Sequence, residues 1–176
     1  MPEASEFTSV RYFTNDFDTK TEGVDLVLTY GWDWEYGSTD LLFSFNHTKT
    51  RVRNFREGST IASGDTIDNL ERGAPETRFN ATATHSVGPW YLVLRYSFFG
   101  EWYDDHSAAE FDGYGLADLL VQYNFASGLA VALGAENFID EYPDKAINYG
   151  NGRKYPRYSP AGHNGALVYA KLSYSM

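Results

Sequence analysis

The sequence predicts an all-β fold in which about eight antiparallel, up-and-down strands form the wall of a transmembrane β-barrel. Three observations carry this prediction: apolar and polar residues alternate, short and long links alternate, and aromatic residues gather at strand ends. Alternation with a period of two places apolar side chains on one face of each strand and polar ones on the other. No stretch approaches the ~18 apolar residues of a membrane-spanning helix, but membrane strands need only ~9–11 residues.

The predicted strands follow one another from the N-terminus. The first, over residues 7–13, is the least regular. The second, over 24–34, is the clearest, with large apolar residues at Val24, Leu26, Leu28, Tyr30, Trp32 and Trp34. The alternation recurs in residues 41–48, 78–84, 90–103, 117–125, 129–136 and 168–176. None of these windows has the helical i, i+3, i+4 stripe, so we expect strands throughout.

The links between these strands alternate in length. Residues 35–38, 86–89 and 126–128 form tight turns with Gly or Pro, whereas residues 51–76, 104–112 and 140–160 form long polar links. The link over 15–23 is intermediate. In an up-and-down barrel, strict alternation puts all short turns on one rim and all long loops on the other, as in outer-membrane barrels.

Aromatic residues provide an independent indication of a membrane. The apolar face carries them next to the short turns, at Trp32, Trp34, Trp90, Tyr123, Phe125 and Tyr174. Trp102 lies at the other end of its predicted strand. Amphipathic rings of this kind form girdles at the lipid–water interface. We therefore expect these residues to lie at the membrane interface.

Charged residues avoid the apolar face. The alternation places them on the opposite, lumen-facing side of the predicted strands, at Asp25, Asp40, Arg78, Arg95, Glu101, Asp118, Glu136 and Lys171. A lipid-facing Arg or Lys at the bilayer midplane costs ~2–4 kcal/mol, so this arrangement is the one that a membrane strand requires. Lumen lining without a specific role is the favoured interpretation of these residues, and contact with a plug or substrate is the alternative.

Composition excludes several function classes. The chain has no Cys, so it has no disulfides and no thiolate nucleophile or metal ligand. The net charge of −10 argues against a nucleic-acid partner. No catalytic, cofactor or phosphate-binding motif is present, and the four histidines are scattered. Asp104, Asp105 and His106 share one long loop and could offer oxygen ligands to Ca²⁺, but solvated loop charge is the favoured interpretation, and we predict no metal.

Three segments carry a family resemblance. Residues 12–15 with 18–26 resemble a strand–link–strand segment of TonB-dependent outer-membrane receptors. Residues 134–143, which read GAENFIDEYP, resemble the Gly-x-x-Asn-Leu-Phe-Asp-x-x-Tyr signature of the penultimate strand in that family. Residues 158–165, followed by a strand to the end of the chain, resemble the entry to the final strand. The likeness covers residues 1–176 as one unit, the C-terminal part of a barrel that has ~22 strands around a plug.

The resemblance implies a non-enzymatic role in the bacterial outer membrane: TonB-dependent uptake of a scarce ligand such as a ferric siderophore. The implied partners are outer-membrane lipid, the remaining barrel and plug, TonB through that absent plug, and the barrel-assembly machinery. That machinery reads the final strand, here through Val168, Ala170, Leu172, Tyr174 and Met176, with Met176 where the family usually has Phe. The external-loop candidates for ligand binding are Arg51, Arg53, Arg56, Asp104, Asp105 and His106, and the arginines suit an anionic chelate or lipopolysaccharide.

Two alternatives stay open at this stage. One is a complete eight-stranded outer-membrane barrel with a structural or adhesive role, since eight strands can close around a side-chain-filled interior. The acidic, polar start of the chain, which lacks a signal-peptide pattern, counts against it. The other is a soluble, lipocalin-like binder with the apolar faces inside, which the rim-placed tryptophans oppose. Folding without detergent is the observation that separates the soluble alternative from both membrane ones.

Overall fold

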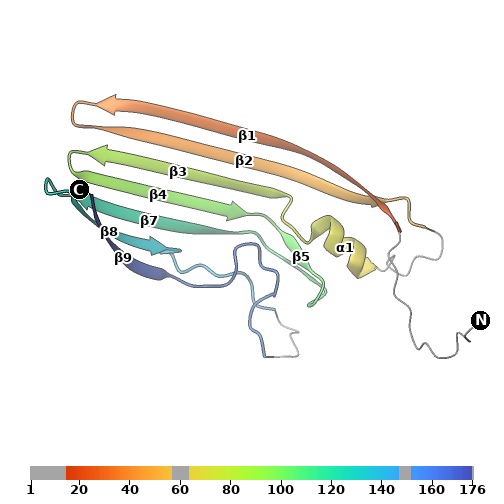
Figure 1. Ribbon diagram of the computed structural model, residues 1–176. Helices are drawn as coiled ribbons and strands as arrows, with labels where there is room; N and C mark the ends of the chain where they lie inside the picture. The colour runs from red at the N-terminus through yellow and green to blue at the C-terminus, as the bar shows by residue number, and fades with distance from the viewer. Residues whose placement is uncertain (1–14, 57–63, 147–151, 176) are drawn as a thin grey trace, which may run out of the picture.

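The computed structural model describes residues 15–56, 64–146 and 152–175. Seven strands form one antiparallel sheet in the order β1-β2-β3-β4-β7-β8-β9 (Figure 1). Their bounds are β1 Asp18–Trp34, β2 Gly37–Arg53, β3 Thr77–Val87, β4 Trp90–Phe99, β7 Tyr114–Asn124, β8 Leu129–Glu136 and β9 Leu167–Tyr174. Two short strands, β5 (Trp102–Asp104) and β6 (Ala109–Phe111), form a separate hairpin between β4 and β7. The helix α1 (Gly64–Arg72) lies between β2 and β3.

The sheet confirms the up-and-down arrangement of the predicted strands. Each strand pairs with its neighbour in the chain, and β4 pairs with β7 across the inserted hairpin. The predicted strand over 7–13 lies outside the described residues. Within the described ranges, β1 and β9 are each paired on one side alone, so the sheet is open rather than closed into a barrel. The fold is therefore a curved wall segment.

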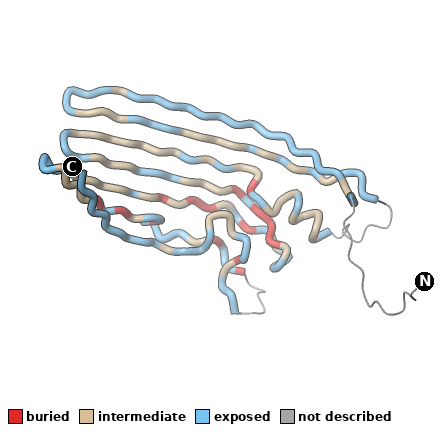
Figure 2. Tube along the Cα trace, viewed as in Figure 1, coloured by how far each residue is buried: buried red, intermediate tan, exposed pale blue. Residues whose placement is uncertain are grey.

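The strand register brings all predicted apolar faces together on one side of the sheet. A single row across five strands joins Leu28, Phe43, Ala81, Tyr96 and Ala117. Many of these apolar side chains are open to the surroundings; Figure 2 shows β1 and β9 exposed along most of their length. We call this side the apolar face and the opposite side the polar face. An apolar face of this extent is the signature of a surface that meets another apolar phase.

The first hairpin is longer than the sequence predicts. β1 and β2 each have 17 residues and continue past the start of β3, where His47 pairs with Thr77. The intermediate link over 15–23 is therefore mostly strand. Threonines on the polar face support this extension, because Thr has high β-propensity and the Thr21 and Thr50 hydroxyls share a hydrogen bond of 3.0 Å.

The structure corrects the predicted strand over 90–103. β4 ends at Phe99, and the Gly100 amide donates to the Thr77 carbonyl at 2.8 Å, where the chain leaves the sheet. Trp102 is therefore not on an exposed strand end: it is 1% exposed and stacks on Phe111 at 5.3 Å. Glu101 lies outside β4 as well, so alternation does not assign it to the polar face. Period-two reasoning fails here because the glycine turn breaks the pleat.

The main cluster of buried side chains lies among the long loops rather than on the sheet (Figure 2). It contains Trp102, Phe111, Tyr114 and Ala146, with Ala161 and two other partly buried residues packed against it. These residues come from the β4–β7 link, from the start of β7 and from the link between β8 and β9. The two loops thus share a small core of their own.

The helix α1 is an element that the sequence does not reveal. It has nine residues in the longest loop and packs against β2 and β5. Its Glu71 carboxylate accepts the Val52 amide at 2.7 Å, and Arg72 pairs with Asp68 and Glu110. So short a helix is marginal alone, and these contacts stabilise it. No helix within the described residues is long and apolar enough to cross a membrane.

Candidate functional site

The predicted interface aromatics form a band at the short-turn end of the apolar face. Their rings contact one another: Trp32 and Trp34 lie 5.6 Å apart, Trp90 and Tyr123 4.8 Å, and Tyr123 and Phe125 4.6 Å. Tyr174 opposes Leu129 at the same end of β8 and β9. The Trp34 indole donates to Thr39 at 2.9 Å, which leaves its ring on the surface with its polar group satisfied. Edge-to-face packing of this kind stabilises such a band by ~0.5–1.5 kcal/mol per pair.

The polar face carries the remaining predicted lumen residues. Register places them opposite the apolar side, at Asp25, Asp40, Arg78, Arg95, Asp118, Glu136 and Lys171. Arg95 and Asp118 are direct cross-strand partners, and the Asn46 amide donates to Asp25 at 2.8 Å. Arg95, Asp118 and Glu136 line an open hollow of about 530 Å³ under the loop that precedes β9. This face is suited to water or to a polar partner.

A turn after β8 holds the start of β9 in place. Asn137 adopts a left-handed backbone (φ 47°), and its side-chain amide donates to the carbonyls of Glu141 at 2.8 Å and Asn164 at 3.2 Å. The backbone amide of Asn137 donates to the Asp118 carboxylate at 2.9 Å. Asp140 accepts the Ala166 amide at 2.9 Å. The signature residues of this segment therefore tie three parts of the chain together.

Tyr142 also contributes a hydrogen bond to this turn. Its hydroxyl donates to the Asp140 carboxylate at 3.1 Å. That hydrogen bond is the main reason why the pKa of Tyr142 is raised above its usual value. A β-carbon on Gly165 would overlap the Tyr142 hydroxyl and the Asp140 carboxylate, so glycine lets the returning chain pass close to this hydrogen bond.

Asp104 links the two large loops. Its side chain is fully buried, and its two carboxylate oxygens accept the amides of His106 at 2.9 Å and Arg157 at 3.1 Å. A hydrogen bond to an ionised acceptor is worth about twice a neutral one. Tyr114 makes a second link, since its hydroxyl contacts the Ser159 hydroxyl at 2.7 Å and accepts the Ala161 amide at 3.1 Å.

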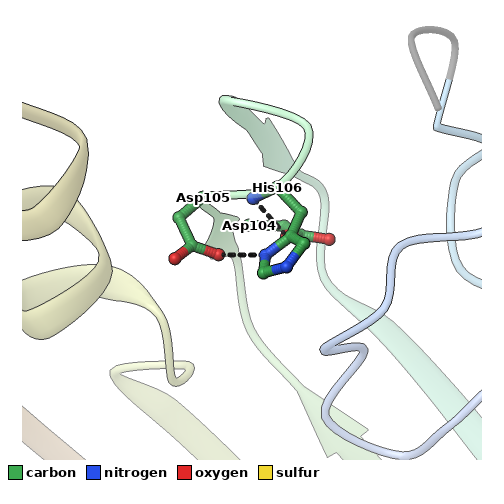
Figure 3. A group of neighbouring side chains, drawn as sticks. All are labelled: Asp104, Asp105 and His106. Atoms are coloured by element: carbon green, nitrogen blue, oxygen red, sulfur yellow. Dashed lines mark hydrogen bonds and ion pairs between the residues drawn. The ribbon is translucent and has the colours of Figure 1, made fainter. Parts of the chain in front are cut away.

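The predicted Asp104–Asp105–His106 group is a compact cluster (Figure 3). Candidate ligand atoms of its three side chains lie within 4.8 Å of one another. His106 already pairs with Asp105 at 2.8 Å, and Asp104 is committed to two backbone amides. These contacts give the cluster a structural role that links the two large loops.

The predicted basic cluster is divided by the fold. Arg51 and Arg53 lie on β2 with the same parity as Phe43 and Phe45, and so belong to the apolar side of the sheet. Arg56 follows the strand, where its amide donates to the Asp16 carbonyl at 2.9 Å. The structure does not place these arginines with the polar face.

The structure brings His106, a predicted candidate, together with loop residues that the sequence reasoning did not name as a site. Tyr155 stacks on Tyr142 at 5.4 Å and on His163 at 6.0 Å. Tyr158 packs against His106 at 5.2 Å, with Arg157 over its ring at 5.4 Å. We call these six residues the aromatic loop cluster. The sequence RKYPRY over 153–158 was a usable signal, because it interleaves basic and aromatic residues.

The final strand keeps its predicted alternation. Val168, Ala170, Leu172 and Tyr174 oppose Ala135, Leu133, Val131 and Leu129 on the apolar face. Val168 is 74% and Leu172 72% exposed. Met176, the last member of the predicted assembly signal, lies outside the described residues.

Comparison with known proteins gives one family. Residues 3–138 match the family model described as TonB dependent receptor-like, beta-barrel, which is more than half of the chain. The match covers β1 to β8 and the turn that begins at Asn137. No curated protein matches the chain.

Proposed function

Because this chain belongs to the TonB-dependent receptor β-barrel family, we propose that it forms ligand-contacting wall and loops of a receptor for a ferric chelate of the siderophore type. Members of the family reside in the bacterial outer membrane and are transporters rather than enzymes. The apolar face is accordingly lipid-facing, and the soluble, lipocalin-like alternative is set aside. The open sheet also disfavours the complete small barrel, since β1 and β9 do not pair with each other in the described part of the chain.

The aromatic loop cluster is the observation that supports a ferric chelate as the ligand. Siderophore chelates are compact, bear aromatic or oxygen-rich chelating groups and are commonly anionic. Tyr155 and Tyr158 offer aromatic surface, and Arg157 and Lys154 lie over these rings at 5.4 Å and 5.3 Å. Stacking and cation–π geometry suit a flat anionic group better than a neutral sugar.

The loop core keeps this cluster in one arrangement. Asp104 accepts the Arg157 amide, and Tyr114 holds Ser159 and Ala161, so the segment on both sides of Tyr158 is fixed. A preorganised loop spends less conformational entropy when a ligand binds. The two loops therefore present the cluster as a single surface on the long-loop side of the wall.

Ligand binding tests the proposal. The full receptor that contains this chain would be reconstituted in lipid nanodiscs and titrated with ferric tris-catecholate and ferric tris-hydroxamate, with tryptophan fluorescence as the signal. We expect Tyr158→Ala with Arg157→Gln to weaken chelate binding at least about tenfold, which matches the loss of one stacked and one charged contact. The matched control is Arg153→Gln, an exposed cation in the same loop. Equal affinity of the double variant and the parent would contradict the assignment.

Uptake in cells tests the energy coupling. Iron delivery through the receptor should require both TonB and the proton gradient of the inner membrane. Uptake that persists in a strain without TonB would leave the chelate-binding result intact but contradict the transport mechanism.

A further inference from the structure

A strip of basic residues continues the lipid-facing side of the first hairpin beyond the apolar band. It consists of Lys20 on β1 and Lys49, Arg51 and Arg53 on β2. Their parity is that of Val24 and Phe45, because side chains on a strand alternate strictly between faces. All four are exposed. We call them the basic strip.

The basic strip lies at a defined height above the lipid-facing residues. The last apolar rows are Leu26 with Phe45 and Val24 with His47. Lys49 is two residues and Arg51 four residues beyond His47, which at ~3.3 Å per residue and a strand tilt of ~40° corresponds to about 5 and 10 Å. The headgroup region adds ~5–7 Å on each side of the hydrocarbon core. The strip therefore lies in and just above the headgroup layer of the leaflet on the long-loop side.

The charges in this strip are incompletely paired within the protein. Lys20 pairs with Glu22, and Lys49 pairs with Glu76 at 3.5 Å, while Asp18 accepts from Asn54 at 2.9 Å. The Arg51 and Arg53 side chains make no hydrogen bond or ion pair within the described ranges. Lys20 and Arg51 also face each other directly across the hairpin. Like charges in that position are destabilising. The Glu22 carboxylate beside them already pairs with Lys20, and its single charge also attracts Arg51 and Arg53.

We propose that the basic strip binds phosphate groups of the glycolipid in the outer leaflet of the outer membrane. Arginine guanidinium groups bind phosphate oxygens in a bidentate manner, and Arg51 and Arg53 are available for this. The anionic chelate that the sequence alone left as the alternative is the poorer occupant, because these side chains point away from the polar face and toward lipid. This site is separate from the aromatic loop cluster, so its test does not depend on the transported ligand.

Lipid binding by purified receptor tests the proposal. The full receptor in mild detergent micelles would be titrated with bisphosphorylated lipid A, and the bound lipid counted by native mass spectrometry. A basic residue near an anionic surface contributes ~1 kcal/mol, so Arg51→Gln with Arg53→Gln should weaken lipid A binding at least about tenfold. The parent should bind phosphate-free lipid A only weakly. This affinity should be about the same as that of the Gln double variant for phosphorylated lipid A.

Two controls make the result decisive. Arg51→Lys with Arg53→Lys keeps the charge and should retain binding within about threefold. Lys145→Gln with Arg153→Gln removes two exposed loop cations away from the strip and should leave binding unchanged. Parent-like binding by the Gln double variant, equal loss in the loop control, or tight binding of phosphate-free lipid A would each overturn the proposal. Heat-modifiable gel mobility confirms that every variant is folded.

Discussion

The Tyr169 ring on β9 lies against Gly134 on β8, its direct cross-strand partner on the polar face. A β-carbon on Gly134 would overlap the ring. Tyr96 covers Gly115 in a similar way on the apolar face. Glycine leaves a gap in the pleated surface, and an aromatic side chain from the adjacent strand fills it.

Replacing Gly134 with Ala should destabilise the folded wall by about 1–3 kcal/mol, because the added methyl group displaces the Tyr169 ring. The urea midpoint of unfolding in detergent micelles measures the change. The variant Gly134→Ala with Tyr169→Ala should recover part of the loss. Gly64→Ala is the control, since a β-carbon there would meet nothing within 4 Å. An unchanged midpoint for Gly134→Ala would show that the ring moves aside freely.

A charge on the apolar face should be far more costly than one on the polar face. Ala81 and Thr82 are adjacent in β3, but they face opposite sides of the sheet. Ala81→Arg should reduce folding into lipid by ~2–4 kcal/mol, whereas Thr82→Arg should change it little. The folded fraction in phosphatidylcholine vesicles, from heat-modifiable mobility, measures both. Equal effects at the two positions would contradict the lipid-facing assignment.

Asp104→Asn should separate the two loops without unfolding the sheet. The amide keeps one oxygen acceptor but offers an N–H group to the other buried amide, and an unsatisfied buried donor costs ~1–3 kcal/mol. Hydrogen exchange at the His106 and Arg157 amides should become faster, while exchange within β4 and β7 stays the same. The half-buried neighbour provides the control, because Asp105→Asn leaves both backbone hydrogen bonds in place. Slow exchange at Arg157 in Asp104→Asn would refute the link.

Asn137→Ala should loosen the entry to β9, because it removes three side-chain hydrogen bonds. It also places alanine in a left-handed backbone that asparagine tolerates better. Asn137→Gly separates the two causes, since glycine relieves the backbone strain but restores none of the bonds. We expect Ala to be the more destabilising, and both to increase hydrogen exchange at Ala166. If Gly restored full protection, the side-chain bonds would have no role.

Local periodicity was enough to predict the wall of this protein. The alternation from Val24 to Trp34 assigned a face to every second residue, and the register of seven strands keeps those residues on one side of the sheet. The same rule assigned Arg95 and Asp118 to the face opposite the apolar one, and the register makes them direct cross-strand partners. It failed at Trp102, because alternation holds only while the chain stays in the pleat.

The loops followed no local rule. In the sequence, Asp104 is one of several acids in a charged loop. In the structure it is fully buried and accepts a hydrogen bond from the backbone amide of Arg157, 53 residues later. The helix α1 depends on Glu71 and Arg72 finding partners on β2 and β6. Arg51 and Arg56 lie close together in the sequence, but the extension of β2 places Arg51 on the apolar side of the sheet.

The sequence by itself therefore determined the strands, their apolar side and the family signature, because these depend on side-chain spacing along one extended segment. The tertiary structure alone decided how far the first hairpin extends, how the loops join, and which cations lie on the apolar side of the sheet. Those features depend on contacts between residues distant in the chain, whose formation is a property of the folded geometry and not of any local pattern.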